Sequence, residues 1–355
     1  MELTKEKAQR IASGPALPTR AFIGGHLCYA SVGAKCKTIN LANAQVIAND
    51  AQCTGTDIDK AVTAARRSFN DGSRSRAGPE YRKKTLLRLA ALIPENTAEL
   101  AVLESLNSGK TKTDYLHEIG NEVADHVQWY AELADKTFGK IAPTGEKAMA
   151  LVVKEPSGVV GLILLWNFPL LMEAWKLASA LDAGCSCIVK KAEHPPLAAL
   201  KLAQLAQESG GPNGVLSVVV GVKETTGQAM WRHHDINIVC FTGSTKVGGY
   251  FPRYAGESNP KSVVLEIGDK SQFIILDDPD LTDDLNEHET TAAFWTSGQT
   301  CSANIRQIVD AKIADSFLDK VIVRAKAYRA SDRFDPSFDT GAIVPQDIWE
   351  RDGIH

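Results

Sequence analysis

The chain has 355 residues, of which 44% are hydrophobic and 23% charged, and its formal net charge is −4. These values predict a globular protein with a substantial core, and the scattered Lys and Arg residues argue against a nucleic-acid partner. The longest apolar run, residues 159–166, is far shorter than the roughly 20 residues that cross a membrane. Because the N-terminus lacks an apolar signal core, we expect a cytoplasmic protein without a membrane partner.

The seven cysteines do not follow the spacing of a disulfide-rich secreted protein. Cys185 and Cys187 are separated by one residue, so on a strand their side chains point to opposite faces of the sheet. No second Cys or His pair follows at the spacing of a zinc site. We therefore expect no metal.

Residues 1–135 are predicted to be mostly helical. Between residues 22 and 56, short apolar pieces broken by Gly and Asn indicate strands and turns. Asp57 is expected to cap a helix whose apolar residues recur at a spacing of three to four. Three further helices are expected at residues 86–93, 100–106 and 115–134. Residues 136–157 form a candidate oligomerisation strand segment.

From residue 148 onward, short β-rich runs alternate with amphipathic helices. The expected strands are residues 159–165, 186–189, 215–220, 236–241 and 262–265, with helices at 171–181, 197–207, 225–231 and 245–254. Apolar strands that alternate with helices predict an α/β fold with a doubly wound parallel sheet, which is a Rossmann-like dinucleotide-binding domain. We assign residues 158–267 to this core and residues 268–355 to the start of a second α/β domain that carries a catalytic cysteine.

A turn that contains Gly243 and Ser244 joins a predicted strand to a predicted helix, and Gly248 follows in that helix. Such a turn presents N–H groups and the positive end of a helix to an anion. At the carboxyl end of a strand in a doubly wound sheet, this is where a dinucleotide binds. The alternative is an ordinary turn in which Ser244 or Thr245 only caps the helix.

Lys190 and Glu193 follow another strand at the same expected edge of the sheet. Together they are suited to bind the hydroxyls of an adenosine ribose, and a carboxylate there disfavours a 2′-phosphate. NAD is therefore expected in preference to NADP, although the neighbouring Lys191 adds positive charge. The alternative is an exposed polar loop.

Cys301 has small and polar neighbours, which predict a loop before a helix that begins near Ser302. A thiol at the start of a helix is activated and reachable by substrate, whereas the alternative is a buried structural cysteine. Glu266 follows an apolar strand and precedes Gly268, so we expect it to project into a cavity and act as a base. The alternative for Glu266 is a solvated strand end.

Asn167 precedes Phe168-Pro169, which restricts the following backbone, so its amide can be held toward a developing oxyanion. Such a donor is worth roughly 3 kcal/mol in comparable sites. An apolar substrate channel is expected, although core packing is the alternative for each of its members. These residues are Phe168, Met172, Trp175 and Trp295.

In combination, these motifs resemble the aldehyde dehydrogenase superfamily. The resemblance extends from about Phe22 to the C-terminus and is closest to the branch that acts on ω-amino aldehydes and betaine aldehyde. It is carried by Trp166-Asn167-Phe168-Pro169, Lys190 with Glu193, Phe241-Thr242-Gly243-Ser244-Thr245, Leu265-Glu266-Ile267-Gly268, Gly298-Gln299-Thr300-Cys301 and Leu106-Asn107-Ser108-Gly109-Lys110.

The resemblance implies oxidation of a small aldehyde to a carboxylic acid with NAD, through a thiohemiacetal and a thioester. It makes Cys301 the nucleophile, Glu266 the activator of the hydrolytic water, and Asn167 a donor to the oxyanion. Lys176 matches a position linked with proton relay. The cofactor-binding residues that it implies are Trp166, Lys190, Glu193, Gly243, Ser244 and Gly248. Members of the family commonly form dimers or tetramers.

The sequence departs from the family pattern at three places. Asp269 follows Gly268 where the family has a second glycine, and Lys191 replaces a usual proline. Family members continue beyond the position of His355, which predicts a C-terminally truncated member whose homo-oligomer is in doubt. Two alternatives follow: a catalytically impaired relative that keeps the dinucleotide-binding fold in a binding or structural role, and an esterase that uses the same thiol without nicotinamide.

Overall fold

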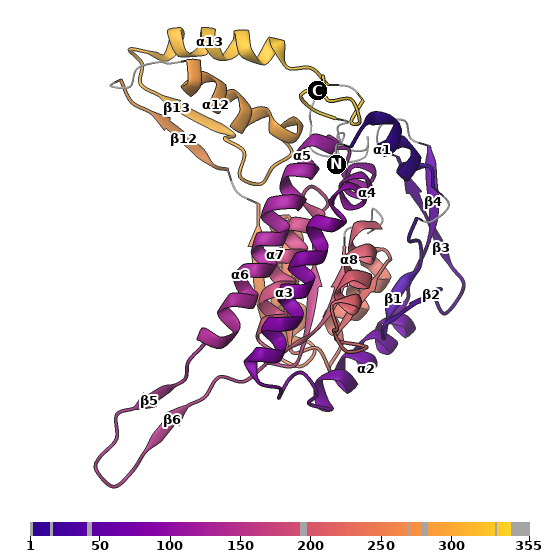
Figure 1. The fold of residues 1–355 in the computed structure, drawn as a ribbon. Coiled ribbons are helices and arrows are strands. Elements are labelled where there is room, and N and C mark those ends of the chain that lie inside the picture. The colour runs from indigo at the N-terminus through magenta and orange to yellow at the C-terminus, as the bar shows by residue number, and fades with distance from the viewer. Residues whose placement is uncertain are drawn as a thin grey trace.

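The computed structural model describes residues 3–14, 17–40, 45–191, 197–268, 270–277, 283–330 and 332–341, with the backbone alone for residues 283–287. No helix within these ranges is both long and apolar enough to cross a membrane. Two lobes and a projecting hairpin make up the described chain (Figure 1).

The N-terminal region is mostly helical, as expected. Its strands are β1 (Ala21–Ile23), β2 (His26–Cys28), β3 (Lys35–Ile39) and β4 (Val46–Ala51). Its helices are α1 (Lys5–Ala12), α2 (Gly55–Asn70), α3 (Pro79–Glu95), α4 (Thr97–Ser108), α5 (Lys112–His117), the π-helix η1 (Glu118–Val123), α6 (Ala124–Leu133) and the 3₁₀-helix η2 (Ala134–Lys136). Asp57 lies inside α2 instead of at its cap, and its carboxylate accepts a hydrogen bond from the N–H of the N-cap residue Thr54 at 2.9 Å.

The central sheet has seven strands in the order β11-β10-β7-β8-β9-β1-β2. Five are parallel: β7 (Val159–Ile163), β8 (Ser186–Lys190), β9 (Leu216–Val219), β10 (Ile238–Gly243) and β11 (Ser262–Ile267). The helices that connect them are α7 (Pro169–Asp182), α8 (Leu197–Glu208), η3 (Lys223–Gly227), α9 (Gln228–Arg232), α10 (Thr245–Gly248) and α11 (Tyr250–Gly256). The doubly wound parallel sheet is thus confirmed, and the antiparallel strands β1 and β2 extend it beyond the prediction.

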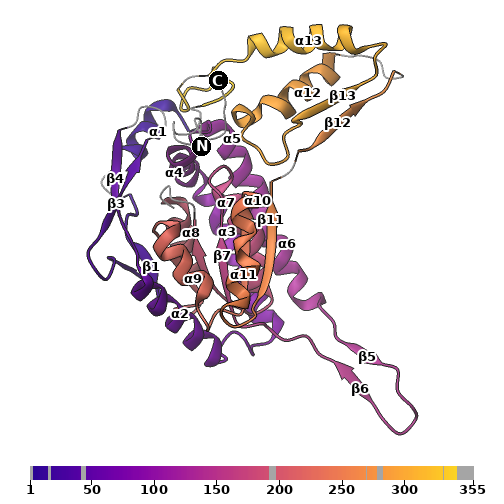
Figure 2. The same ribbon diagram turned by 180° about the vertical axis from the view of Figure 1, so that it is seen from behind.

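Hydrophobic cores cover both faces of this sheet. Leu162 points to one face, where α3, α4, α6, α7 and α8 pack, and its neighbour Ile163 points to the other, where α2, α9 and α11 pack. Figures 1 and 2 show these two helical layers from opposite sides. Both neighbours are buried because the sheet is enclosed, and this explains the continuous apolar runs of the strands.

The C-terminal lobe is smaller. The parallel strands β12 (Gln272–Ile275) and β13 (Arg306–Val309) lie beside α12 (Asp283–Phe294), the 3₁₀-helix η4 (Trp295–Gly298) and α13 (Ala314–Ala327). Its described core consists of Ile275, Phe317 and Val321. At the opposite end of the molecule, β5 (Lys140–Ala142) and β6 (Ala150–Val152) form an antiparallel hairpin that projects away from the body (Figures 1 and 2).

Hydrogen bonds join the C-terminal lobe to the sheet domain near the predicted site residues. The amide nitrogen of Asn167 donates to the main-chain oxygen of Gln299 at 2.7 Å, and the indole N–H of Trp295 donates to Asp114 at 3.1 Å. Arg333, which is 3% exposed, donates to the main-chain oxygen of Ser105 at 2.6 Å. The region around the cysteine loop is therefore anchored to α5 and the segment before α7, and the segment of Arg333 is anchored to α4.

Candidate active site

The strand order places the candidate site at a switch point of the sheet. From β7 the chain proceeds through β8 to β9 on one side, and then returns to β10 and β11 on the other side. Ile163 at the end of β7 is in register with Lys190 on β8 and with Phe241 on β10. In open α/β sheets, ligands bind outside the carboxyl ends of the strands at such a switch point.

The predicted cofactor residues lie around these strand ends. Trp166 is half-buried in the bend after β7, and Lys190 ends β8 with its ammonium donating to the main-chain oxygen of Lys191 at 2.9 Å. Ser244 is exposed and is the N-cap of α10, where its hydroxyl accepts from the N–H of Val247 at 3.4 Å. The capping interpretation is therefore correct for Ser244 in this structure, and it does not exclude contact with a ligand.

The turn after β10 presents polar side chains to solvent. Ser244, Thr245 and Lys246 are all exposed there, so a hydroxyl pair and an ammonium face solvent beside the switch point. A side chain at Gly248 would put its Cβ 2.8 Å from Ile267, so this helix packs closely against β11. Glu193, the predicted partner of Lys190, lies outside the described residues.

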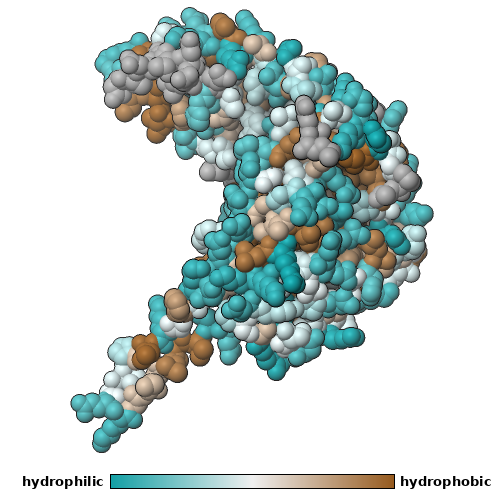
Figure 3. Space-filling view, in the orientation of Figure 1, coloured by the Kyte–Doolittle hydropathy of each residue, from teal (hydrophilic) through white to brown (hydrophobic). Residues whose placement is uncertain are grey.

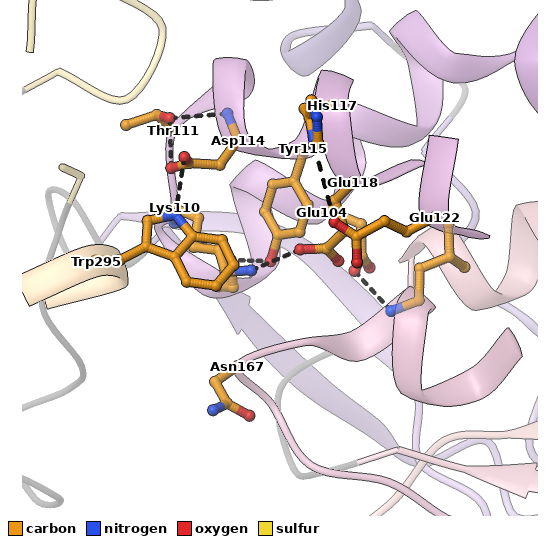
Figure 4. A network of polar contacts seen from close by, with 12 residues as sticks. Glu104, Lys110, Thr111, Asp114, Tyr115, His117, Glu118, Glu122, Asn167 and Trp295 are labelled. Atoms are coloured by element: carbon orange, nitrogen blue, oxygen red, sulfur yellow. Dashed lines mark hydrogen bonds and ion pairs between the residues drawn. The ribbon is translucent and has the colours of Figure 1, made fainter. Parts of the chain in front are cut away.

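Asn167 is the link between the sheet and the cysteine loop. Its side chain is 8% exposed, and its Oδ1 atom is buried without a hydrogen-bond partner among the described residues. The segment that carries it is fixed at the start of α7, because the N–H of Leu170 donates to the buried carboxylate of Glu104 at 2.8 Å. Figure 4 shows Asn167 at one side of a polar cluster that includes Glu104 and Trp295.

Cys301 is exposed, so the interpretation as a buried structural cysteine is wrong. The expected helix near Ser302 is also wrong. A turn in which the N–H of Ala303 donates to the main-chain oxygen of Thr300 at 3.1 Å leads the chain into β13, which begins at Arg306. Residues 302–305, all of which the structure describes, form a turn that leads directly into this strand, so no helix begins between the cysteine and β13.

The backbone just before Cys301 has an unusual conformation. Thr296 and Ser297 have positive φ angles of 57° and 58°, and Gly298 follows with φ 72°. For residues other than glycine this left-handed conformation costs roughly 1–2 kcal/mol each. Such strain is often stored next to functional groups, and here it directs the chain toward the cysteine.

Glu266 and Lys176 lie on the same side of the sheet. Glu266 is exposed at the end of the edge strand β11, instead of being enclosed in a cavity as expected. Lys176 is half-buried on α7, and burial lowers its pKa, while the negative charge of Glu266 opposes that shift. The two predicted proton-transfer groups therefore interact electrostatically.

Of the four predicted channel residues, Phe168, Met172 and Trp295 belong to or pack against one core cluster, whereas Trp175 does not. The rings of Phe168 and Trp295 lie 5.4 Å apart, and the ammonium of Lys110 lies 3.5 Å from the Phe168 centroid and 5.3 Å from that of Trp295. Met172 is buried, whereas Trp175 is 44% exposed and stacks on His126 at 5.2 Å.

Sequence reasoning missed the buried charges that support this region. Lys110 pairs with Glu118 at 2.8 Å, and their side chains are 1% and 2% exposed. Figure 4 shows Lys110 and Trp295 on one side of Tyr115, and Glu104 and Glu118 on the other. Nothing in the spacing of these residues marks them as partners, although Lys110 belongs to a motif that carried the family resemblance.

An open pocket of about 550 Å³ lies behind the cysteine loop, between α12 and α13. Gly298 and Ala303 contribute to its wall, together with apolar side chains such as Phe294, Leu318 and Ile322. Cys301 itself does not line this pocket, so the pocket is not the predicted channel.

Comparison with known proteins gives a consistent result. A family model described as the aldehyde dehydrogenase family matches residues 29–351. The aminoacetaldehyde dehydrogenase of Pseudomonas aeruginosa is 43% identical over 349 residues, which cover 98% of this chain and 70% of that protein. The NADP/NAD-dependent aldehyde dehydrogenase PuuC of Escherichia coli is 39% identical, with coverage of 96% and 68%.

Solved structures share the fold. An indole-3-acetaldehyde dehydrogenase of P. syringae in complex with NAD⁺ has a TM-score of 0.95 at 38% identity, over 98% of this chain and 70% of that one. The γ-glutamyl-γ-aminobutyraldehyde dehydrogenase of Burkholderia cenocepacia also has a TM-score of 0.95, at 40% identity over 98% and 71% of the two chains.

Proposed function

This chain belongs to the aldehyde dehydrogenase family, and we propose that it oxidises an aldehyde to a carboxylic acid with NAD, by way of a thioester on Cys301. The observation that carries the proposal is the 2.7 Å hydrogen bond from Asn167 to the main chain of Gln299. This bond brings an amide donor to the loop of the exposed cysteine, which supports a role for Asn167 as an oxyanion donor.

The chain's own residues supply a nucleophile, an oxyanion donor and a base. The sulfur of Cys301 bonds to the carbonyl carbon, and the displaced π electrons move to the oxygen, which accepts hydrogen bonds from Asn167 and the Cys301 N–H. Bound NAD would supply the hydride acceptor, and loss of the hydride from that carbon would leave a thioester on Cys301. Glu266 then takes a proton from a water molecule that attacks the thioester, so the acid forms and the thiolate departs.

For the cofactor, we propose that the switch point of the sheet holds NAD. Lys190 and Glu193 are assigned to the adenosine ribose, and Ser244 to the pyrophosphate. Trp166, Gly243 and Gly248 complete the proposed cofactor surface. The exposed turn after β10 supports this assignment, and relatives of this fold have been solved with NAD⁺.

For the substrate, we propose an amino aldehyde or a similar small aldehyde. The names of the P. aeruginosa and B. cenocepacia relatives, which refer to aminoacetaldehyde and γ-glutamyl-γ-aminobutyraldehyde, support this class. We assign the substrate channel to Phe168, Met172, Trp175 and Trp295, and proton relay to Lys176.

We also propose that the β5–β6 hairpin, within residues 136–157, is a contact between copies of the chain. Its apolar side chains project into solvent, with exposed fractions of 74% for Ile141, 77% for Met149 and 63% for Leu151. Figure 3 shows hydrophobic residues exposed along the projecting arm. For the other domains, we assign residues 1–135 and 158–267 to the cofactor-binding domain. Residues 268–355 are assigned to the domain that carries Cys301. Seven free thiols favour a reducing compartment such as the cytoplasm.

Formation of NADH from NAD and aminoacetaldehyde or propanal tests the proposed function. We expect activity in the wild type, none in Cys301→Ala, and unchanged activity in the control Cys36→Ala, whose thiol is half-buried on β3. Binding of NAD without NADH formation would instead support a non-catalytic relative. Hydrolysis of an activated aryl ester that persists without NAD would support the esterase alternative.

A further inference from the structure

We propose that Lys191 and Glu173 form a buried positioning pair that ties the end of the cofactor strand β8 to the helix α7, which follows Asn167. Neither residue is assigned to cofactor, substrate or the reacting atoms, so both act through their neighbours. The inference rests on the proposed function, because the two elements that the pair joins carry its cofactor-binding and oxyanion-binding groups.

The side chain of Lys191 inserts between two fully buried carboxylates. Its ammonium lies 3.3 Å from Glu173 Oε2 and 3.8 Å from Glu104 Oε1, and the exposed fractions are 4% for Lys191 and 0% for both glutamates. Burial raises the pKa of both carboxyl groups, and the charge of Lys191 opposes that shift. A buried cation shared by two carboxylates fixes the end of its strand firmly, because each charge is costly to bury without the other.

On the strand side, the backbone of Lys191 helps to orient the side chain of Lys190. The Lys190 ammonium donates to the main-chain oxygen of Lys191 at 2.9 Å, so its direction depends on the backbone that the Lys191 side chain anchors. The main-chain oxygen of Lys190 in turn accepts from the N–H of Leu164 at 3.1 Å, at the point where β7 leads toward Trp166. The pair therefore supports Lys190 and the segment that leads to Trp166, which are both predicted to contact the cofactor.

On the helix side, the same cation holds the start of α7. Glu173 belongs to the first turns of α7, and the other oxygen of Glu104 accepts from Leu170 at the start of that helix. The backbone that follows Asn167 is thereby fixed relative to β8. A substitution at Lys191 is expected to shift the Asn167 amide. Because this amide is bonded to Gln299, the loop of Cys301 is expected to shift as well.

The pair is held by charge more than by aligned hydrogen bonds. Among the described residues, neither the Lys191 ammonium nor the Glu173 carboxylate has a hydrogen-bond partner, although they lie at ion-pair distance. A replacement that keeps shape but removes charge, such as Glu173→Gln, therefore removes most of the interaction.

The test compares Lys191→Met, Glu173→Gln and the double variant Lys191→Met/Glu173→Leu by calorimetric titration with NAD and by the rate of Cys301 alkylation with iodoacetamide. Both single variants are expected to bind NAD about tenfold more weakly and to change the alkylation rate. The double variant leaves no unpaired charge at Glu173, but Glu104 still lacks its cation. It is therefore expected to regain part of the stability against denaturant that Lys191→Met loses, but not NAD affinity. Lys201→Met, which removes a partly exposed pair with Glu99 at 2.8 Å, is the matched control and should change neither readout.

If the pair only stabilises the fold, the same experiments give a different result. If the double variant recovers NAD affinity together with stability, or if folded Glu173→Gln binds NAD and is alkylated as the wild type is, the positioning role is overturned. Failure of the wild type itself to bind NAD would instead count against the proposed function. In that event the alkylation rate still decides the positioning role, since an unchanged rate in the single variants overturns it.

Discussion

Asn167 and Gln299 come from different lobes, and the amide nitrogen of the first lies 2.7 Å from the main-chain oxygen of the second. Gln299 is followed closely by Cys301, so this hydrogen bond sets the distance between the end of β7 and the thiol. The same nitrogen is the group that the account assigns to the oxyanion. The bond therefore holds the proposed oxyanion donor at the loop that carries Cys301.

Removal of this donor is expected to slow catalysis without unfolding the protein. Asn167→Ala should lower kcat by a factor of about 10²–10³, the usual cost of losing one oxyanion donor. Steady-state NADH formation measures the effect. Asn121→Ala changes an exposed asparagine on η1 and should leave kcat unchanged. An Asn167→Ala enzyme with full kcat would remove Asn167 from the chemistry.

The buried pair of Lys110 and Glu118 is expected to be essential for stability. Lys110→Met leaves the Glu118 carboxylate, which is 2% exposed, without its cation, and should lower the free energy of unfolding by about 3–5 kcal/mol. Denaturant unfolding should be measured above the pKa of about 7 to which burial raises Glu118. The matched control Lys83→Met breaks a surface pair with Asp135 at 2.5 Å and should have little effect. Equal losses of unfolding free energy in Lys110→Met and Lys83→Met would contradict the burial of the Lys110–Glu118 pair.

Asp50 is expected to make the protein less stable as the pH rises. Its side chain is buried on β4 with a hydrogen bond from the Thr38 hydroxyl, and burial raises its pKa from 3.8 to about 7. Between these values the unfolded chain has lost the proton and the folded chain still holds it. The contribution of Asp50 to the free energy of unfolding therefore falls as the pH rises through this window, by at most about 1.4 kcal/mol per pH unit, and is constant below and above it.

Asp50→Asn removes this titration, so its stability relative to the wild type should rise across the same window. Unfolding by denaturant at several pH values measures the difference. Asp71 is a useful control, because a hydrogen bond from the Ser73 N–H lowers the pKa of its exposed carboxyl. Asp71→Asn should show no such gain. A difference between Asp50→Asn and the wild type that stays constant with pH would contradict the prediction.

At the left-handed turn before Cys301, we expect a Gly substitution to be less destabilising than an Ala substitution, which is the opposite of the order in a helix. At Ser297, with φ 58°, both Ala and Gly lose the hydroxyl contact with Thr340 at 2.7 Å, but only Gly adopts this backbone without strain. Ser297→Gly should therefore be more stable than Ser297→Ala by about 1 kcal/mol. In helix α13, at Ser316, the order should reverse, since Gly is worse than Ala in a helix by up to about 1 kcal/mol. The same order at both positions would show that Ser297 is not left-handed.

The projecting hairpin should control self-association. Ile141→Glu combined with Leu151→Glu places charges on its exposed apolar surface, where Ile141 is paired in register with Leu151. Light scattering coupled to size exclusion should show a smaller species than the wild type. Glu substitutions at Val323 and Leu318, which are 72% and 51% exposed on α13, serve as the control. A wild type that is already monomeric would exclude the hairpin as a contact between copies.

Much of the fold could be predicted because its signals are local. The strands β7 to β10 are bounded apolar runs such as that of Val159, which is fully buried, and the helices between them have regular apolar spacing. The antiparallel strands β1 and β2 could not be placed, because β1 pairs through Phe22 with Val218, a residue far along the chain. Register over such a separation is decided by tertiary packing.

For the site, residue types could be predicted more readily than their surroundings. Motifs predict roles for Asn167 and Cys301, but in place of the helix expected after Cys301 the chain turns directly into β13. The left-handed conformation of Thr296 and Ser297 has no sequence signal, since neither residue is of the type that usually adopts it. The partners of Lys110 and Lys191 likewise depend on how separate helices and strands pack.

The most direct test of the central claim is the mass of the protein after reaction with NAD and aldehyde in the Glu266→Gln variant. Because this variant lacks the base that activates water, the account predicts that an acyl group accumulates and that peptide mapping places it on Cys301. The doubly substituted Cys301→Ala/Glu266→Gln protein should gain no mass. No acyl group in Glu266→Gln while NADH forms, or an acyl group on one of the other six cysteines, would contradict the account.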